Sequence, residues 1–131
     1  MADAADIHGT AFRNGSATLM TRVVGSDAEA IVQADLASAE YTVYLLNDQD
    51  PDDRTAVTGH TDVALVVADL IFDSLQTDAR WTVDQTGYNF RHELDVSANE
   101  AFAAAGRYLV EFELTPSVGQ VILVRFRIHA I

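Results

Sequence analysis

The sequence has no cysteine, only two prolines among its 131 residues, and eight basic residues against twenty acidic ones. Without cysteine, the chain can form neither a disulfide framework nor a thiolate site. The net charge of −12 argues against nucleic-acid binding, which depends on basic patches that neutralise phosphates, and against binding to an anionic membrane surface. We therefore expect its partners to be proteins, with no nucleic acid and no membrane among them.

Long apolar runs are also absent, because Asp69 and Asp73 interrupt the most hydrophobic stretch before it could span a bilayer. Residues 1–6 contain no basic segment followed by an apolar core, so we expect no secretion signal and interpret them as a short acidic tail. Residues 7–131 have the length of one domain with a sizeable core and show no internal repeat. The predicted organisation is a tail and a single domain.

The clearest pattern lies in the last quarter of the chain, where apolar and charged residues alternate. The even-numbered positions are apolar, namely Tyr108, Val110, Phe112, Leu114, Val124, Phe126, Ile128 and Ala130. A period of two with one charged face predicts half-buried strands, and Pro116 and Gly119 mark a turn between them. We therefore predict a long antiparallel hairpin over residues 106–131.

The same alternation restricts how the two strands of this hairpin pair. The apolar positions of both strands must share a face, which leaves two neighbouring registers. One register places Glu111 opposite Arg125, and the other places Glu111 opposite Leu123. Opposite charges across a strand pair contribute about 0.2–1 kcal/mol, so we predict the first register.

Shorter β-rich segments precede the hairpin at a spacing of roughly ten residues, with turn residues between them. Strands are predicted at residues 7–13, 16–24, 40–46, 62–67, 80–84 and 88–94. The Asn14-Gly15 pair separates the first two segments, and because it favours a type I′ turn, we expect these segments to form a hairpin. In the fifth segment, Trp81 and Val83 should point inward.

Three further segments need separate interpretation. The strand over residues 88–94 should place its even positions inward and its odd positions, including Asn89, outward. Residues 35–39 are predicted to be a corner. Residues 62–76 are compatible with either a strand or a buried helix with a polar stripe. The alternating valines favour a strand at 62–67, followed by a second short strand or a single turn at 69–75.

Eight or nine short strands with turns between them predict an all-β antiparallel β-sandwich with one or two short helical turns. The segment from Gly106 to Val110 resembles the tyrosine-corner strand of immunoglobulin-like domains through Tyr108, although Ala104 stands where the fuller pattern often has Asp. The order of motifs over residues 40–130 is similar to that of immunoglobulin-like modules in tailed-phage virion proteins. These motifs are a Tyr-Thr-Val-Tyr strand, an acidic loop, a Trp strand and a Gly-x-Tyr-x-x-Glu-Phe-x-Leu-Thr strand.

An acidic loop over residues 47–54 is the one candidate metal site. It contains four aspartates, Asp48, Asp50, Asp52 and Asp53. Oxygen ligands at alternating positions suit calcium, but an EF-hand would need Glu at the twelfth loop position, where this chain has Gly59. We expect a solvated acidic loop, with a looser calcium site at Asp48, Asp50 and Asp52 as the alternative, and no other cofactor.

No set of residues has the spacing of a catalytic site. The four histidines, His8, His60, His92 and His129, do not follow a metal-binding pattern. We expect His92 to be a hydrogen-bonded core histidine and His60 to be a loop residue without a partner. There is no Gly-x-Ser-x-Gly motif and no Gly-rich phosphate loop. We therefore predict that the protein is not an enzyme.

Several aromatic residues raise the alternative of a sugar-binding platform, because aromatic rings offer flat apolar area with a polar tip. The candidates are Tyr41, Tyr44, Trp81, Tyr88 and Phe90. The sequence has a single tryptophan, and its alternation points inward, so we expect most of these rings to fill the core of the sandwich.

The end of the last strand points to assembly. This strand stays apolar up to Ile131, and its other face concentrates positive charge in an acidic protein at Arg125, Arg127 and His129. Pairing of strand edges between subunits is a physical route to assembly through such residues. We expect these four residues to lie at an interface with protein partners, in a homo-oligomer or a larger assembly.

Together these patterns lead to one functional expectation and one alternative. We expect a non-enzymatic structural or adaptor subunit. The resemblance to phage modules implies a virion component, such as a capsid-decorating or head/tail protein, located in the virion or in the cytoplasm before assembly. The alternative is a carbohydrate- or calcium-binding β-sandwich module.

Overall fold

A computed structural model of the chain describes residues 7–11, 17–25, 29–47, 49–50, 53–79, 81, 85–94, 101–102 and 105–131. The strands in these ranges are β1 (Ile7–Ala11), β2 (Thr18–Thr21), β3 (Leu36–Leu46), β4 (Arg54–Ala56), β5 (Val63–Leu65), β6 (Ile71–Gln76), β7 (Tyr88–Glu93), β8 (Gly106–Pro116) and β9 (Ile122–Ala130). Two short helices accompany them, the 3₁₀ helix η1 (Gln33–Asp35) and α1 (Val67–Leu70). Neither described helix has the length and apolar character needed to cross a membrane.

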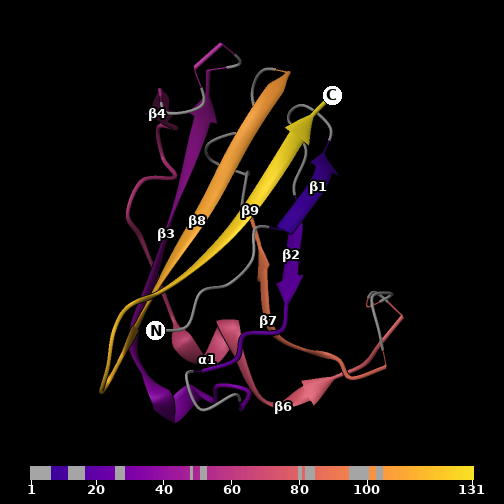
Figure 1. Ribbon diagram of the computed structural model, residues 1–131, viewed down its shortest axis with the longest axis vertical. Helices are drawn as coiled ribbons and strands as arrows, with labels where there is room; N and C mark the ends of the chain where they lie inside the picture. Colours follow the sequence, from indigo (N-terminus) through magenta and orange to yellow (C-terminus); the bar gives the residue numbers. More distant parts are fainter. Residues whose placement is uncertain are drawn as a thin grey trace.

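The strands form two sheets (Figure 1). The larger sheet has the order β1-β9-β8-β3-β4, with β5 also pairing with β3, and the smaller sheet has the order β2-β7-β6. The described strand pairs are antiparallel, except for β1, which runs parallel to β9. The predicted all-β sandwich is therefore confirmed, with one parallel pair that the sequence did not indicate.

Aromatic side chains from the two sheets meet in the core. Phe90 of the smaller sheet packs edge-on against Phe112 of the larger sheet, with ring centroids 4.8 Å apart, and stacks on Phe126 at 5.8 Å. All three rings are at most 2% exposed. Because each large buried side chain contributes roughly 1.5–3 kcal/mol to stability, this contact between the sheets is a major part of the core.

The β8–β9 hairpin has the predicted register. Glu111 lies opposite Arg125, and Val110 lies opposite Phe126. The inner positions of both strands are buried as expected, with Val110 and Val124 completely inaccessible. The alternation of apolar and charged residues therefore determined both the pairing of these strands and their buried face.

The predicted hairpin between the first two strands is wrong. β1 pairs with residues Phe126–Ala130 of β9, whereas β2 joins the other sheet and pairs with β7. Asn14 and Gly15, which prompted the prediction, lie outside the described residues. Each segment instead pairs with a longer strand, β1 with β9 and β2 with β7, and these pairings place the two segments in different sheets.

The structure also corrects the interpretation of two intermediate segments. Residues 36–39 belong to β3 and are not a corner; the irregularity there is a register shift between Leu36 and Ser38 against β8. In the ambiguous stretch 62–76, the strand β5 is shorter than predicted, and both a helical turn, α1, and a further strand, β6, follow it. The strand β4 was not predicted.

Trp81 lies outside any described strand, while residues 80 and 82–84, including Val83, lie outside the described part of the chain. The Trp81 ring is half-buried and packs on Tyr88, with centroids 5.4 Å apart. The inward orientation of Trp81 is thus partly realised, at the end of the smaller sheet.

Asn89 is the largest departure from the expected pattern, since an outward-facing residue turns out to be 1% exposed. Its Oδ1 accepts a hydrogen bond from the Val23 amide at 2.7 Å. Its Nδ2 donates to the carbonyl oxygens of Val23 at 2.9 Å and Ile31 at 3.0 Å. The Asn89 side chain therefore supplies hydrogen-bond partners to backbone groups in the segment between β2 and η1. Among the described residues, the backbone of β7 does not pair with this segment.

Candidate functional site

The outer face of the larger sheet carries a group of carboxylates. Along β3, Tyr41 is buried in the core, while its neighbour Glu40 lies on the opposite face because successive strand residues alternate. The pairing of β3 with β8 places Glu40 directly opposite Glu113 and Thr42 opposite Glu111. Two like charges are thereby brought face to face, an arrangement that is destabilising when both are ionised.

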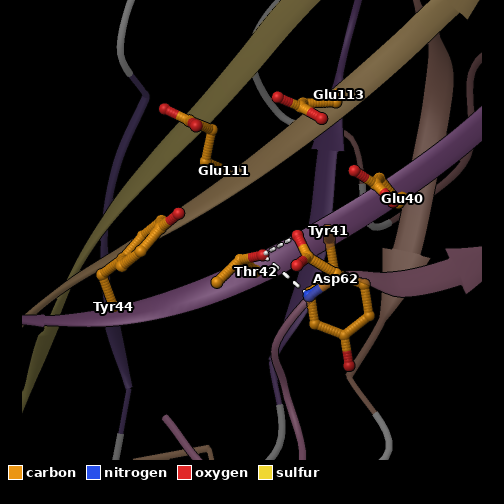
Figure 2. Close-up of a pocket in the computed structure, with 7 residues that line it drawn as sticks. All are labelled: Glu40, Tyr41, Thr42, Tyr44, Asp62, Glu111 and Glu113. Carbon is orange, nitrogen blue, oxygen red and sulfur yellow. Dashed lines mark hydrogen bonds between the residues drawn. The ribbon is translucent and has the colours of Figure 1, made fainter. Parts of the chain in front are cut away.

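These residues surround a shallow depression, here called the acidic pocket (Figure 2). Its lining consists of Glu40, Tyr41, Thr42, Tyr44, Asp62, Glu111 and Glu113. The pocket has a volume of about 30 Å³. Such a volume holds about two water molecules, whereas pockets for organic ligands are roughly ten times larger.

Asp62 reaches this pocket from the connection between β4 and β5. Its backbone amide donates a hydrogen bond to Thr42 Oγ1 at 2.9 Å, and the Thr42 hydroxyl lies 3.4 Å from Asp62 Oδ1 (Figure 2). Asp62 has a φ of 49°, a left-handed conformation that aspartate tolerates better than most residues. This local geometry fixes a third acidic group beside the pair on β3 and β8.

One carboxylate of the acidic pocket, Glu113, has a shifted pKa. A hydrogen bond with Glu40 is the main cause that raises the pKa of Glu113, followed by partial burial and the surrounding negative charges. Glu111 differs, because Arg125 Nε lies 3.0 Å from its Oε2. The site therefore places Glu113, whose pKa is raised, opposite Glu40 and next to Glu111, which is ion-paired with Arg125.

Paired carboxyl groups can serve as acid and base in glycoside hydrolysis, which requires a sugar between them. The acidic pocket is a shallow depression of about 30 Å³, far below the volume of pockets that enclose organic ligands. What this arrangement can do chemically is to take up a proton as the pH falls.

A second polar group lies in the interior, between the sheets. His60 is 2% exposed, and its Nδ1 lies 2.8 Å from Tyr41 Oη. On the other side, the Tyr41 ring packs on His92 of β7, with centroids 5.1 Å apart. We call His60, Tyr41 and His92 the histidine cluster.

The histidine cluster corrects two expectations. The prediction that His60 has no partner is wrong, because its backbone amide donates to Val57 and its carbonyl accepts from Val43, in addition to the Tyr41 contact. The inward position of His92 is confirmed, but its predicted hydrogen bonding is not found at Nε2. That atom is buried and has no hydrogen-bond partner among the described residues.

Burial has a direct electrostatic consequence for His92. Desolvation is the main cause that lowers the pKa of its imidazole, and the positive form of His60 lowers it further, while Glu93 acts in the opposite direction. His92 is therefore held neutral more firmly than a histidine in water.

The candidate calcium ligands are only partly described. Asp48 and Asp52 lie outside the described residues. Asp50 and Asp53 belong to a turn in which the Asp53 amide donates to Asp50 O at 3.0 Å and Asn47 Nδ2 donates to Asp53 Oδ2 at 3.1 Å. Within the described ranges, no three acidic or histidine side chains are grouped so that they could hold a metal ion.

The interface candidates on β9 fall into two groups. Arg127 and His129 lie in the half that β1 covers, where they are register partners of His8 and Thr10. Arg125 lies in the other half, Ile122–Arg125, which we call the open half of β9. It pairs with β8 on one side, and on its other side none of the described strands pairs with it. Ile131, just beyond β9, is 51% exposed.

The aromatic candidates for a sugar platform do not share a surface. Tyr41, Tyr88 and Phe90 are at most 4% exposed and belong to the interior. Tyr44 lies on the outer face with the Arg54 guanidinium 4.2 Å above its ring. The expectation that most of these rings fill the core is confirmed.

The structure brings together residues that the sequence did not associate. The acidic pocket depends on the β3–β8 register, and the only available signal was that Glu40, Glu111 and Glu113 each occupy the outward position of a predicted strand. The histidine cluster depends on the path of the β4–β5 connection, for which the sequence gives no periodic signal.

Comparison of the chain with protein-family models found no match, and comparisons with curated proteins and with solved structures found none either. The function therefore has to be inferred from the residues of this chain.

Proposed function

We propose that the protein is a non-enzymatic structural or adaptor subunit that assembles with other protein chains through the open half of β9. The observation that carries this proposal is the unequal coverage of β9. Residues Phe126–Ala130 pair on both sides, whereas Ile122–Arg125 pair only with β8 in the described part of the chain (Figure 1). An unpaired strand edge offers backbone donors and acceptors to a strand of another chain.

Apolar side chains at the adjoining turn support this route. Val118, at the tip of the β8–β9 hairpin, is 91% exposed, and Val121, just before β9, is 44% exposed. A strand that adds to the open half of β9 would pass next to these valines and cover them. The backbone edge would then supply hydrogen bonds and the valines would supply apolar contact area.

The small size of the acidic pocket, about 30 Å³, supports a structural role, because pockets that enclose organic substrates are far larger. The type of assembly follows from the resemblance of residues 40–130 to immunoglobulin-like modules of phage virions, which makes a capsid-decorating or head/tail component the specific form of the proposal. Its location would then be the virion, or the cytoplasm before assembly.

Sedimentation analysis over a wide range of concentrations tests the proposal. We expect the wild-type protein to form oligomers, and the double variant Val118→Lys/Val121→Lys to shift toward monomer, because lysine beside a strand edge opposes pairing. Val66→Lys is the matched control, since Val66 is 62% exposed and lies away from β9, between β5 and α1.

Electron microscopy of the purified protein would show whether the oligomers have a regular form. Two results together contradict the proposal. The protein would have to stay strictly monomeric at the highest workable concentration when alone, and it would also have to form no complex with its expected virion partners. An equal loss of assembly in the Val66→Lys control would also contradict it, because the effect would then not be specific to β9.

A further inference from the structure

The contact between the two sheets includes an ionisable side chain. His92 projects from β7 of the smaller sheet and packs against Tyr41 of β3 and Phe112 of β8, both in the larger sheet, with ring centroids 5.1 Å and 5.5 Å away. The register partner of His92 on β2 is Leu19, which is buried. The imidazole therefore occupies a position where most of its surroundings are apolar.

A protonated His92 would lack compensation in this environment. Its Nε2 is buried and has no hydrogen-bond partner among the described residues, so a proton added there would point at no acceptor. The hydroxyl of Tyr41, whose ring packs on His92, is already within hydrogen-bond distance of His60 Nδ1.

The charged and titratable groups around His92 also disfavour its protonated form. From β3 it faces Tyr41, and from the β4–β5 connection it faces His60, whose positive form would repel a second charge. Its facing residues on β2 and β8 are the apolar Leu19 and Phe112. Among the described residues, Glu93, the next residue on β7, is the group that favours the charged form.

We propose that His92 is an acid-sensitive contact between the two sheets: its protonation under mildly acidic conditions weakens the packing of β7 against β3 and β8. The smaller sheet then opens from the larger sheet at lower cost than at neutral pH. The direction of this pH dependence follows from the difference between the pKa of His92 in the folded and the unfolded protein. A histidine whose folded pKa lies below its unfolded value of 6.5 contributes stability above that value and loses it as the pH falls toward the folded pKa.

Thermal unfolding of the wild-type protein and of His92→Phe tests this proposal, because phenylalanine keeps a ring packed against Tyr41 and Phe112 but cannot be protonated. Between about pH 7.5 and about pH 5, the melting temperature of the wild type should fall at least about 3 °C further than that of the variant. Glu113, on the outer face, titrates in both proteins and cancels in the comparison. His129→Gln, which removes an exposed histidine, should behave like the wild type.

Nuclear magnetic resonance of the wild-type protein provides a second measurement if His92→Phe does not fold. We expect the His92 ring to titrate below its ordinary value, and the free energy of opening of the β7 amides to fall with pH more than that of the β8 amides. A His92 titration at or above 6.5, or equal pH dependence in wild type and His92→Phe, would overturn the proposal.

Discussion

Arg125 on β9 lies directly opposite Glu111 on β8, and its Nε atom is 3.0 Å from Glu111 Oε2. Their side chains are 38% and 13% exposed, so the pair is partly shielded from water. The contact stabilises the correct register of the longest hairpin, since a shift of one residue would move every apolar side chain to the wrong face.

The strength of this ion pair can be measured with a double-mutant cycle. We expect Glu111→Gln and Arg125→Gln to show a coupling free energy of about 0.2–1 kcal/mol in urea denaturation, a range typical of cross-strand and partly exposed charge pairs. The coupling should decrease at high salt, because mobile ions screen the pair. A coupling of zero would mean that the apolar face alone determines the register.

Asn89→Ala should destabilise the protein by about 3 kcal/mol, because three hydrogen bonds to buried backbone groups are lost at roughly 1 kcal/mol each. Urea denaturation measures this loss. Asn47→Ala, at an exposed loop position, serves as the control and should cost clearly less. A loss below about 1 kcal/mol for Asn89→Ala would show that water replaces the side chain.

Glu113 should make stability depend on pH in the direction opposite to His92. Its pKa is raised in the folded protein, so the associated stabilisation is fully present below the unfolded value of 4.5 and is lost as the pH rises through the folded value. Glu113→Gln retains hydrogen bonding to Glu40 without a charge. Its stability relative to the wild type should therefore increase between about pH 4 and about pH 7.

Chemical denaturation at several pH values measures this difference, with Asp69→Asn as the control at an exposed acidic position of α1. The same relative gain in the control would show that the effect comes from the overall negative charge and not from the pair of Glu40 and Glu113.

Two glycines allow a steric effect to be separated from a conformational one. Gly87 and Gly119 both have positive φ, at 104° and 110°. A Cβ on Gly87 would lie 2.5 Å from the carbonyl oxygen of Gln76, whereas a Cβ on Gly119 meets nothing within 4 Å. We expect Gly119→Ala to cost about 1–2 kcal/mol and Gly87→Ala clearly more. Equal losses would mean that the backbone near Gln76 moves aside.

The hairpin of β8 and β9 could be predicted in detail because its alternation extends over many residues and the outer face is mostly charged, with Leu109 and Leu123 as exceptions. The acidic pocket could not be predicted, because the rule that opposite charges pair across strands argues against it. Opposite charges correctly identified Glu111 and Arg125 as partners, but the rule would have rejected Glu40 opposite Glu113. There the apolar pair of Tyr41 and Phe112 on the inner face determines the register.

Local signals failed where partners distant in sequence decided the outcome. The turn preference of Asn14-Gly15 predicted a hairpin, yet the flanking strands belong to different sheets. Asn89 follows the outward parity of β7, yet it is buried because the backbone of Val23 and Ile31 needs hydrogen-bond partners. Single-strand periodicity does not report such requirements.

The parallel pairing of β1 with β9 has a consequence for biosynthesis. β1 is the first of the described strands to leave the ribosome, and its register partners in β9 are the last. The larger sheet cannot be completed until translation has passed Ala130, so the N-terminal segment must wait without its partner. Such distant contacts slow folding, because a long loop has to be closed before they form.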